Sequence, residues 1–127
     1  MIFELNSDQA MLAESAKRLS EETLSPILAR EPSGKPLSKE VMLEIYGHLA
    51  GFGITAARLP EEFGGSGLSM LDYGLIMEQL PPVVALSLLS HDGSTVRFNA
   101  GADEAVRATY LADFREGRKI VCTANSE

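Results

Sequence analysis

The sequence predicts an all-α fold, an orthogonal bundle of about five helices that ends in the first strand of a missing β domain. Three observations lead to this prediction. Apolar residues recur at helical spacing along most of the 127 residues. Serine or aspartate precedes most of these stretches, and glycine or proline follows them, as is typical of helix starts and stops. The last residues, in contrast, form a short segment rich in β-branched side chains, as is typical of a strand.

The first predicted helix begins at Ser7 and runs toward Pro26. The Ser7 hydroxyl can accept a hydrogen bond from a free N–H of the first turn, which makes Ser7 the expected N-cap. Pro26 is expected to kink or end the helix, because proline lacks the N–H donor and clashes with the preceding turn. Residues 31–36 then form a loop. The buried stripe is formed by Leu12, Ala16, Leu19, Thr23 and Ile27.

The second helix is predicted to start after Ser38 and to end at Gly51 and Gly53. Residues 54–60 show no clear period, so we expect an extended or irregular segment there. Residues 60–67 are rich in turn-forming types. The stripe of the second helix is formed by Met42, Ile45, Leu49 and Phe52.

The third and fourth helices are separated by Pro81–Pro82. The third begins after Ser69 and runs to about Leu80. The fourth covers residues 83–100, and its first turns carry no charge. A helix that is apolar on most sides is normally covered by others, so we expect residues 83–100 to be the most buried element.

The fifth helix is capped by Asp103 and closed by Gly117, and residues 119–124 after it form the expected strand. A lone strand leaves an unpaired edge. We therefore expect a helical domain over residues 1–118 and the start of a β domain over 119–127. The side chains expected inward on the fifth helix are Val106, Tyr110, Leu111 and Phe114.

Composition excludes several classes of protein. The net charge of -7 argues against a nucleic-acid surface, which needs clustered Lys and Arg. The uncharged run over residues 79–91 is too short to span a membrane, and the first residues lack the basic start of a signal peptide. The single cysteine, Cys122, forms no intrachain disulfide, so we expect a reducing, cytoplasmic setting.

The residues alone indicate no catalytic or metal site. His48 and His91 lie far apart and lack metal-ligand spacing. The glycine-rich residues 64–67 follow two glutamates and contain no lysine, so a structural turn is favoured over a phosphate-binding loop.

Four stretches nevertheless resemble the N-terminal helical domain of the acyl-CoA dehydrogenase family. The most specific is the middle one, which reads GFGI and then LPEEFGGSGLSMLD. The stretches are Ser7 to Pro26, Leu49 to Asp72, Gly101 to Gly117 and Thr123 to Glu127. Together they cover almost the whole chain, which corresponds to about the first third of a family subunit.

The resemblance implies α,β-dehydrogenation of an acyl-CoA thioester, with FAD as the hydride acceptor. It implies a β-barrel domain after this one, and a C-terminal helical domain that supplies the catalytic base, so no catalytic residue is expected in this chain. The acyl pocket would be walled by the fourth helix, through Val84, Leu88 and His91. The flavin-contacting strand would begin with Thr123, Ala124, Asn125 and Ser126.

The implied partners are the acyl-CoA substrate, the remaining domains of the same polypeptide, further copies in a homo-oligomer and an electron-transferring flavoprotein. Three features depart from the family pattern: Pro81–Pro82, Asn125, and Ser126 where threonine is usual. They leave open a relative with a bulky ring substrate, an oxygen-using relative or a structural subunit. The alternative is a non-catalytic helical module of the same fold that binds a protein or a lipid-like ligand.

Overall fold

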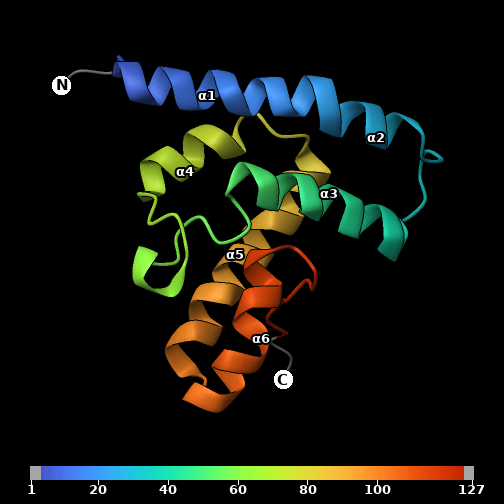
Figure 1. Ribbon diagram of the computed structural model, residues 1–127. Helices are drawn as coiled ribbons and strands as arrows, with labels where there is room; N and C mark the ends of the chain where they lie inside the picture. Colours follow the sequence, from blue (N-terminus) through green and yellow to red (C-terminus); the bar gives the residue numbers. More distant parts are fainter. Residues whose placement is uncertain (1–3, 125–127) are drawn as a thin grey trace.

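The fold is all-α, as predicted, and the computed structural model describes residues 4–124 (Figure 1). A long rod at the top of Figure 1 consists of α1 (Ser7–Leu19), a π-helical turn (Ser20–Leu24) and α2 (Ser25–Ala29). Beneath it lie α3 (Lys39–Phe52) and α4 (Met70–Met77). The longest helix, α5 (Pro82–Gly101), begins just under the rod, passes behind α3 and descends steeply, and α6 (Glu104–Arg115) returns beside its lower part.

The helix starts follow local capping chemistry. Ser38, Ser69 and Asp103 cap α3, α4 and α6 through their side-chain oxygens, as predicted. The expected cap at Ser7 is wrong by one residue. Asn6 Oδ1 accepts the Gln9 N–H at 2.8 Å while Gln9 Oε1 accepts the Asn6 N–H at 3.2 Å, so a reciprocal capping box places the start of α1.

Pro26 neither ends nor breaks the first helical rod. The Ser25 N–H donates to the Ser20 carbonyl five residues back, which is the wide hydrogen-bonding pattern of a π turn. Pro26 then falls in the first turn of α2, where its missing N–H is tolerated. The rod continues to Ala29 for this reason.

The predicted strand is not formed in the described part of the tail. Residues 120–124 adopt no regular element. A strand needs hydrogen bonds to a second strand, and residues 4–124 contain none.

The hydrophobic core lies where α3, α4 and α5 meet the first rod. The side chains of this core are almost completely buried, and α3 contributes three of them, Ile45, Tyr46 and Leu49. α5 has more buried residues than any other helix among the described residues, as predicted. Leu86 and Leu89 are a correction to that prediction, because they are 72% and 47% exposed and the buried face holds Val84, Leu88 and several polar side chains. On α6, Leu111 and Phe114 are buried as expected, whereas Val106 and Tyr110 are exposed.

No helix among the described residues is both long enough and apolar enough to span a membrane.

Candidate functional site

The three pocket residues predicted on α5 lie inside this domain. Val84 is 2% exposed, and Leu88 and His91 are fully buried. Val84 and Leu88 belong to the core shared with α3 and α4. Their side chains therefore hold α5 against its own domain, and the exposed side of α5 is formed by other residues.

His91 joins α5 to α6 and to the segment that follows α6. The Val121 N–H donates to Nδ1 at 3.1 Å, so Nδ1 carries no proton and Nε2–H donates to the Phe114 carbonyl at 3.1 Å. Tyr46 and Phe114 meet the imidazole ring edge to face. Burial lowers the pKa of His91, while the Phe114 hydrogen bond and the nearby Asp92 act in the opposite direction.

The predicted flavin-strand residue Thr123 is held by the same helix. Its Oγ1 lies 2.8 Å from Ser94 Oγ and accepts from Arg97 Nη1 at 3.4 Å. Together with the His91–Val121 bond, these contacts attach the exit segment, residues 119–124, to α5. Ala124 is exposed, and Asn125 and Ser126 lie outside the described residues.

A buried ion pair beside this helix was missed from the sequence. Asp92 is fully buried on α5, and its carboxylate accepts from Arg58 Nε at 2.5 Å and from the Arg58 backbone N–H at 3.2 Å. Arg58 lies over the Tyr73 ring, 5.3 Å from its centroid. The position of Asp92 could have indicated this pair, because an acidic residue in the middle of an apolar helix is normally buried only when it is paired with a cation.

The exposed side of α5 is apolar in its first half. Val83, Leu86 and Leu89 are 50%, 72% and 47% exposed. Large side chains left uncovered on one helix face mark a surface that meets a partner, a ligand or another domain.

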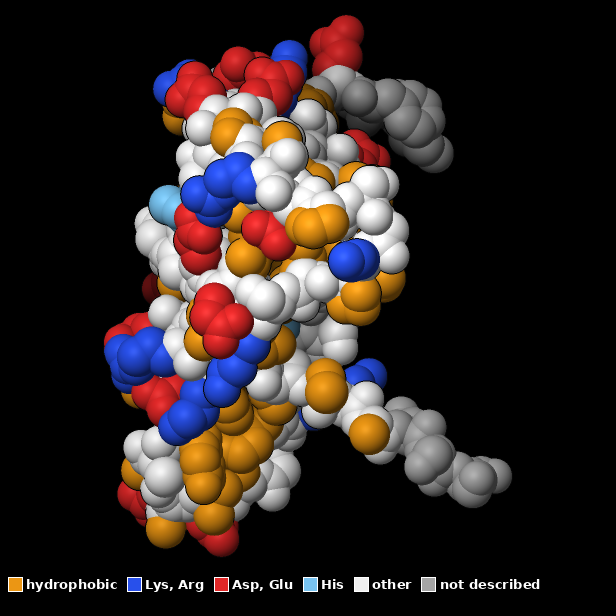
Figure 2. Space-filling view, turned by 90° about the vertical axis from the view of Figure 1, so that its right-hand side faces the viewer, with side chains coloured by type: hydrophobic (Ala, Val, Ile, Leu, Met, Phe, Trp, Pro, Cys, Tyr) orange, Lys and Arg blue, Asp and Glu red, His pale blue; other side chains and the backbone are white. Residues whose placement is uncertain are grey.

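A second apolar surface lies beside the exit segment. A groove of about 740 Å³ runs between α3, α6 and residues 118–122. Figure 2 shows hydrophobic side chains gathered at the level of α5 and α6, with Lys and Arg side chains next to them. Of the basic residues on the rim, Lys119 lies over the Tyr110 ring at 5.3 Å.

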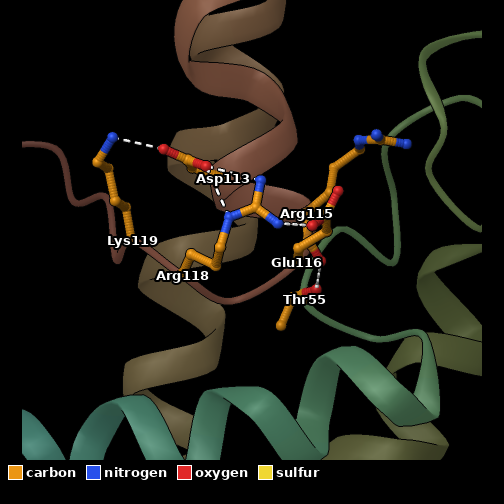
Figure 3. A network of polar contacts seen from close by, with 6 residues as sticks. All are labelled: Thr55, Asp113, Arg115, Glu116, Arg118 and Lys119. Carbon is orange, nitrogen blue, oxygen red and sulfur yellow. Dashed lines mark hydrogen bonds and ion pairs between the residues drawn. The ribbon is translucent and has the colours of Figure 1, made fainter.

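The end of α6 is fixed by a polar network (Figure 3). Asp113 pairs with both Lys119 and Arg118, and Arg118 also pairs with Glu116. The Lys119 and Arg118 hydrogen bonds lower the pKa of Asp113. On the other side, the Thr55 hydroxyl donates to the Arg115 carbonyl, so the segment after α3 and the end of α6 are tied together.

The polar groups described above hold segments of the chain in place, and the described residues show no metal-binding cluster. Within residues 4–124, no cluster of three or more His, Cys, Asp or Glu side chains could hold a metal ion. The backbone groups of residues 122–124 have no hydrogen-bond partner in the described part of the chain, so they could pair with a cofactor or another strand.

Comparison with known proteins shows the family of this chain. The family model for the acyl-CoA dehydrogenase N-terminal domain matches residues 6–118. The human mitochondrial short-chain specific acyl-CoA dehydrogenase is 29% identical over 133 residues, covering 98% of this chain and 30% of that protein. Bovine mitochondrial isovaleryl-CoA dehydrogenase is 28% identical over 127 residues, covering 97% and 29%. The chain thus spans about 30% of the length of these relatives.

Two solved structures are similar to this chain. The FAD complex of PigA superimposes with a TM-score of 0.76 at 26% identity. Butyryl-CoA dehydrogenase from Megasphaera elsdenii superimposes with a TM-score of 0.70 at 27% identity. Each match covers 94% of this chain and 32% of the other.

Proposed function

Because the chain belongs to the acyl-CoA dehydrogenase family as its N-terminal domain, we propose that it is part of a flavoenzyme that oxidises an acyl-CoA thioester between its α and β carbons. The observation that carries the proposal is the match over residues 6–118, which extends over almost the whole helical domain. The solved structures support it, since one holds FAD and another is a butyryl-CoA dehydrogenase.

In this proposal the chain contributes a pocket wall rather than catalytic groups. The buried side of α5, with Val84, Leu88 and His91, fixes the helix in its domain. Its exposed Leu86 and Leu89 are then the α5 side chains available to an acyl chain. We assign no catalytic base to this chain.

The exit segment leads toward the cofactor in the same proposal. Residues 1–118 form the helical domain, and residues 119–127 begin the β domain. Ser94 and Arg97 hold Thr123 at this boundary, and the unpaired backbone of residues 122–124 fits a flavin-contacting strand. FAD, when bound, would accept the hydride, and an electron-transferring flavoprotein would reoxidise it.

The test uses the protein that contains this chain at its full length, loaded with FAD. Acyl-CoA-dependent dye reduction is measured for the wild type, for Leu86→Glu and for Met11→Glu. Met11 is the matched control, because it is 67% exposed on α1 and Leu86 is 72% exposed on α5.

The proposal expects turnover by the wild type, a loss of about 10-fold or more in kcat/KM for Leu86→Glu, and no change for Met11→Glu. The magnitude follows from a charge placed against an apolar acyl chain. A flavin-free wild type with no turnover on any acyl-CoA would contradict the proposal and favour a non-catalytic interaction module.

A further inference from the structure

Arg58 is held rigidly at the edge of the domain. Its Nε and backbone N–H both donate to Asp92, its guanidinium lies over Tyr73, and Nη1 contacts the Met70 sulfur at 3.2 Å. These contacts come from two helices and fix the plane of the guanidinium. A long side chain held in this way loses little further entropy when it binds a ligand.

One nitrogen of this guanidinium is left over. Nη2 has no hydrogen-bond acceptor among residues 4–124, and the Arg58 side chain as a whole is 25% exposed. Asp92 cancels much of the arginine charge, because its buried carboxylate is paired directly with it. What remains is an oriented N–H donor rather than a strong cation.

The free nitrogen lies at one end of the exposed apolar stripe of α5. Leu86, Leu89 and Gly93 follow one another at steps of three and four residues, so they share one face of the helix. A Cβ atom at Gly93 would lie 3.4 Å from Arg58 Nη2, and no other atom would be within 4 Å. Since Gly93 has no side chain, the guanidinium edge is uncovered where the stripe ends.

The geometry points to Arg58 as a specificity-determining residue that donates a hydrogen bond to an oxygen at the far end of the acyl group. This inference rests on the proposed function, because it requires that the exposed face of α5 walls the acyl pocket. The substrate class is then an acyl-CoA whose chain carries a hydroxyl or carbonyl oxygen. An unmodified alkyl chain would leave the Arg58 donor without an acceptor, which is unfavourable once water is excluded.

The experiment replaces the ion pair by a neutral pair of similar shape. Arg58→Gln alone would leave Asp92 buried without a cation and endangers folding. The double variant Arg58→Gln with Asp92→Asn keeps a side-chain contact and an acceptor for the backbone N–H of residue 58. The matched control is Arg30→Gln with Glu44→Gln, an exposed ion pair whose side chains are 58% and 41% exposed.

The FAD-loaded full-length protein is assayed with straight-chain acyl-CoAs and with their terminally hydroxylated counterparts. We expect the wild type to prefer hydroxylated chains. The quantity compared is kcat/KM for the hydroxylated acyl-CoA divided by kcat/KM for the unmodified one, and the Arg58/Asp92 double variant should lower this ratio by about 10- to 100-fold. The Arg30/Glu44 control should leave the ratio unchanged.

A ratio that is the same in the wild type and in the Arg58/Asp92 double variant overturns the inference while the proposed function stands. A wild type that oxidises neither kind of chain overturns the proposed function, and the inference falls with it. Circular dichroism checks that the double variant is folded. A lost preference for hydroxylated chains in a folded variant then reflects the missing Arg58 donor.

Discussion

At the scale of single residues, His91 shows what local sequence cannot predict. The family resemblance implies that His91 lines the acyl pocket. In the structure both ring nitrogens already have partners, the Phe114 carbonyl and the Val121 N–H. The spacing of residues along α5 could not reveal this, because the Val121 donor arrives from 30 positions further along the chain.

The bond from Val121 requires neutral His91, which gives a pH dependence. Burial lowers the folded-state pKa of His91 below its ordinary value of 6.5, so the unfolded chain binds more protons between these two values. The stabilisation is complete above pH 6.5 and is lost as the pH falls through 6.5 toward the lowered folded pKa.

We expect denaturant unfolding of the wild type to show a falling free energy of unfolding below pH 6.5, and His91→Gln to lose much of this slope. His48→Gln is the control, because His48 is an exposed residue on α3. Equal slopes for the wild type and His91→Gln would contradict the assignment.

The Arg58–Asp92 pair predicts a large difference between two arginines. Arg58→Ala leaves the Asp92 carboxylate buried without a cation and should cost about 3–5 kcal/mol in the free energy of unfolding. Arg30→Ala removes an exposed partner of Glu44 and should cost about 0–1 kcal/mol. Urea titration of both variants measures the difference, and similar losses would show that Asp92 is not energetically dependent on Arg58.

At the scale of elements, helix starts were the most predictable feature. The caps at Ser38, Ser69 and Asp103 depend on atoms within three residues, so local sequence determines them. The path through Pro26 was not predictable in this way, since a π turn absorbs the proline within an otherwise continuous rod. The strand predicted for the tail is absent among the described residues, because a strand needs a partner strand and local sequence does not provide one.

The two faces of α5 predict different losses of stability for two leucines that are close in sequence. Leu88 is fully buried, so Leu88→Ala should lower the free energy of unfolding by about 2–5 kcal/mol. The charge-free run of α5 suggested the same cost for Leu86, but its exposure predicts less than about 0.5 kcal/mol for Leu86→Ala. Chemical denaturation of the isolated chain decides between them, and a large loss at Leu86 would contradict the orientation of α5.

Two glycines predict changes of opposite sign. A Cβ at Gly65 would lie 2.0 Å from the Leu59 carbonyl oxygen, so Gly65→Ala should destabilise the loop after α3. A Cβ at Gly47 meets nothing within 4 Å in the middle of α3, so Gly47→Ala should stabilise the chain by about 0.5–1 kcal/mol. Thermal unfolding of each variant tests this, and a destabilising Gly47→Ala would count against the open surface of α3.

At the scale of the whole molecule, the family motifs predicted more than periodicity did. Helical spacing indicated an all-α chain, while the stretch from Leu49 to Asp72 indicated which helical domain it is. The match over residues 6–118 confirms that identification. The exposed stripe of α5 and the Arg58 donor could not be predicted, because they arise from the packing of segments far apart in sequence.

We propose that this chain supplies one wall of a flavoenzyme and does not hold the flavin by itself. In this proposal the described residues offer FAD the unpaired backbone of residues 122–124 and the Thr123 side chain, and so few contacts cannot offset the entropy lost on binding. The most direct measurement is the flavin absorbance of the isolated chain and of the full-length protein, purified in parallel with added FAD. We expect bound flavin in the full-length protein alone. Stoichiometric flavin on the isolated chain, or none on the full-length protein, would contradict the claim.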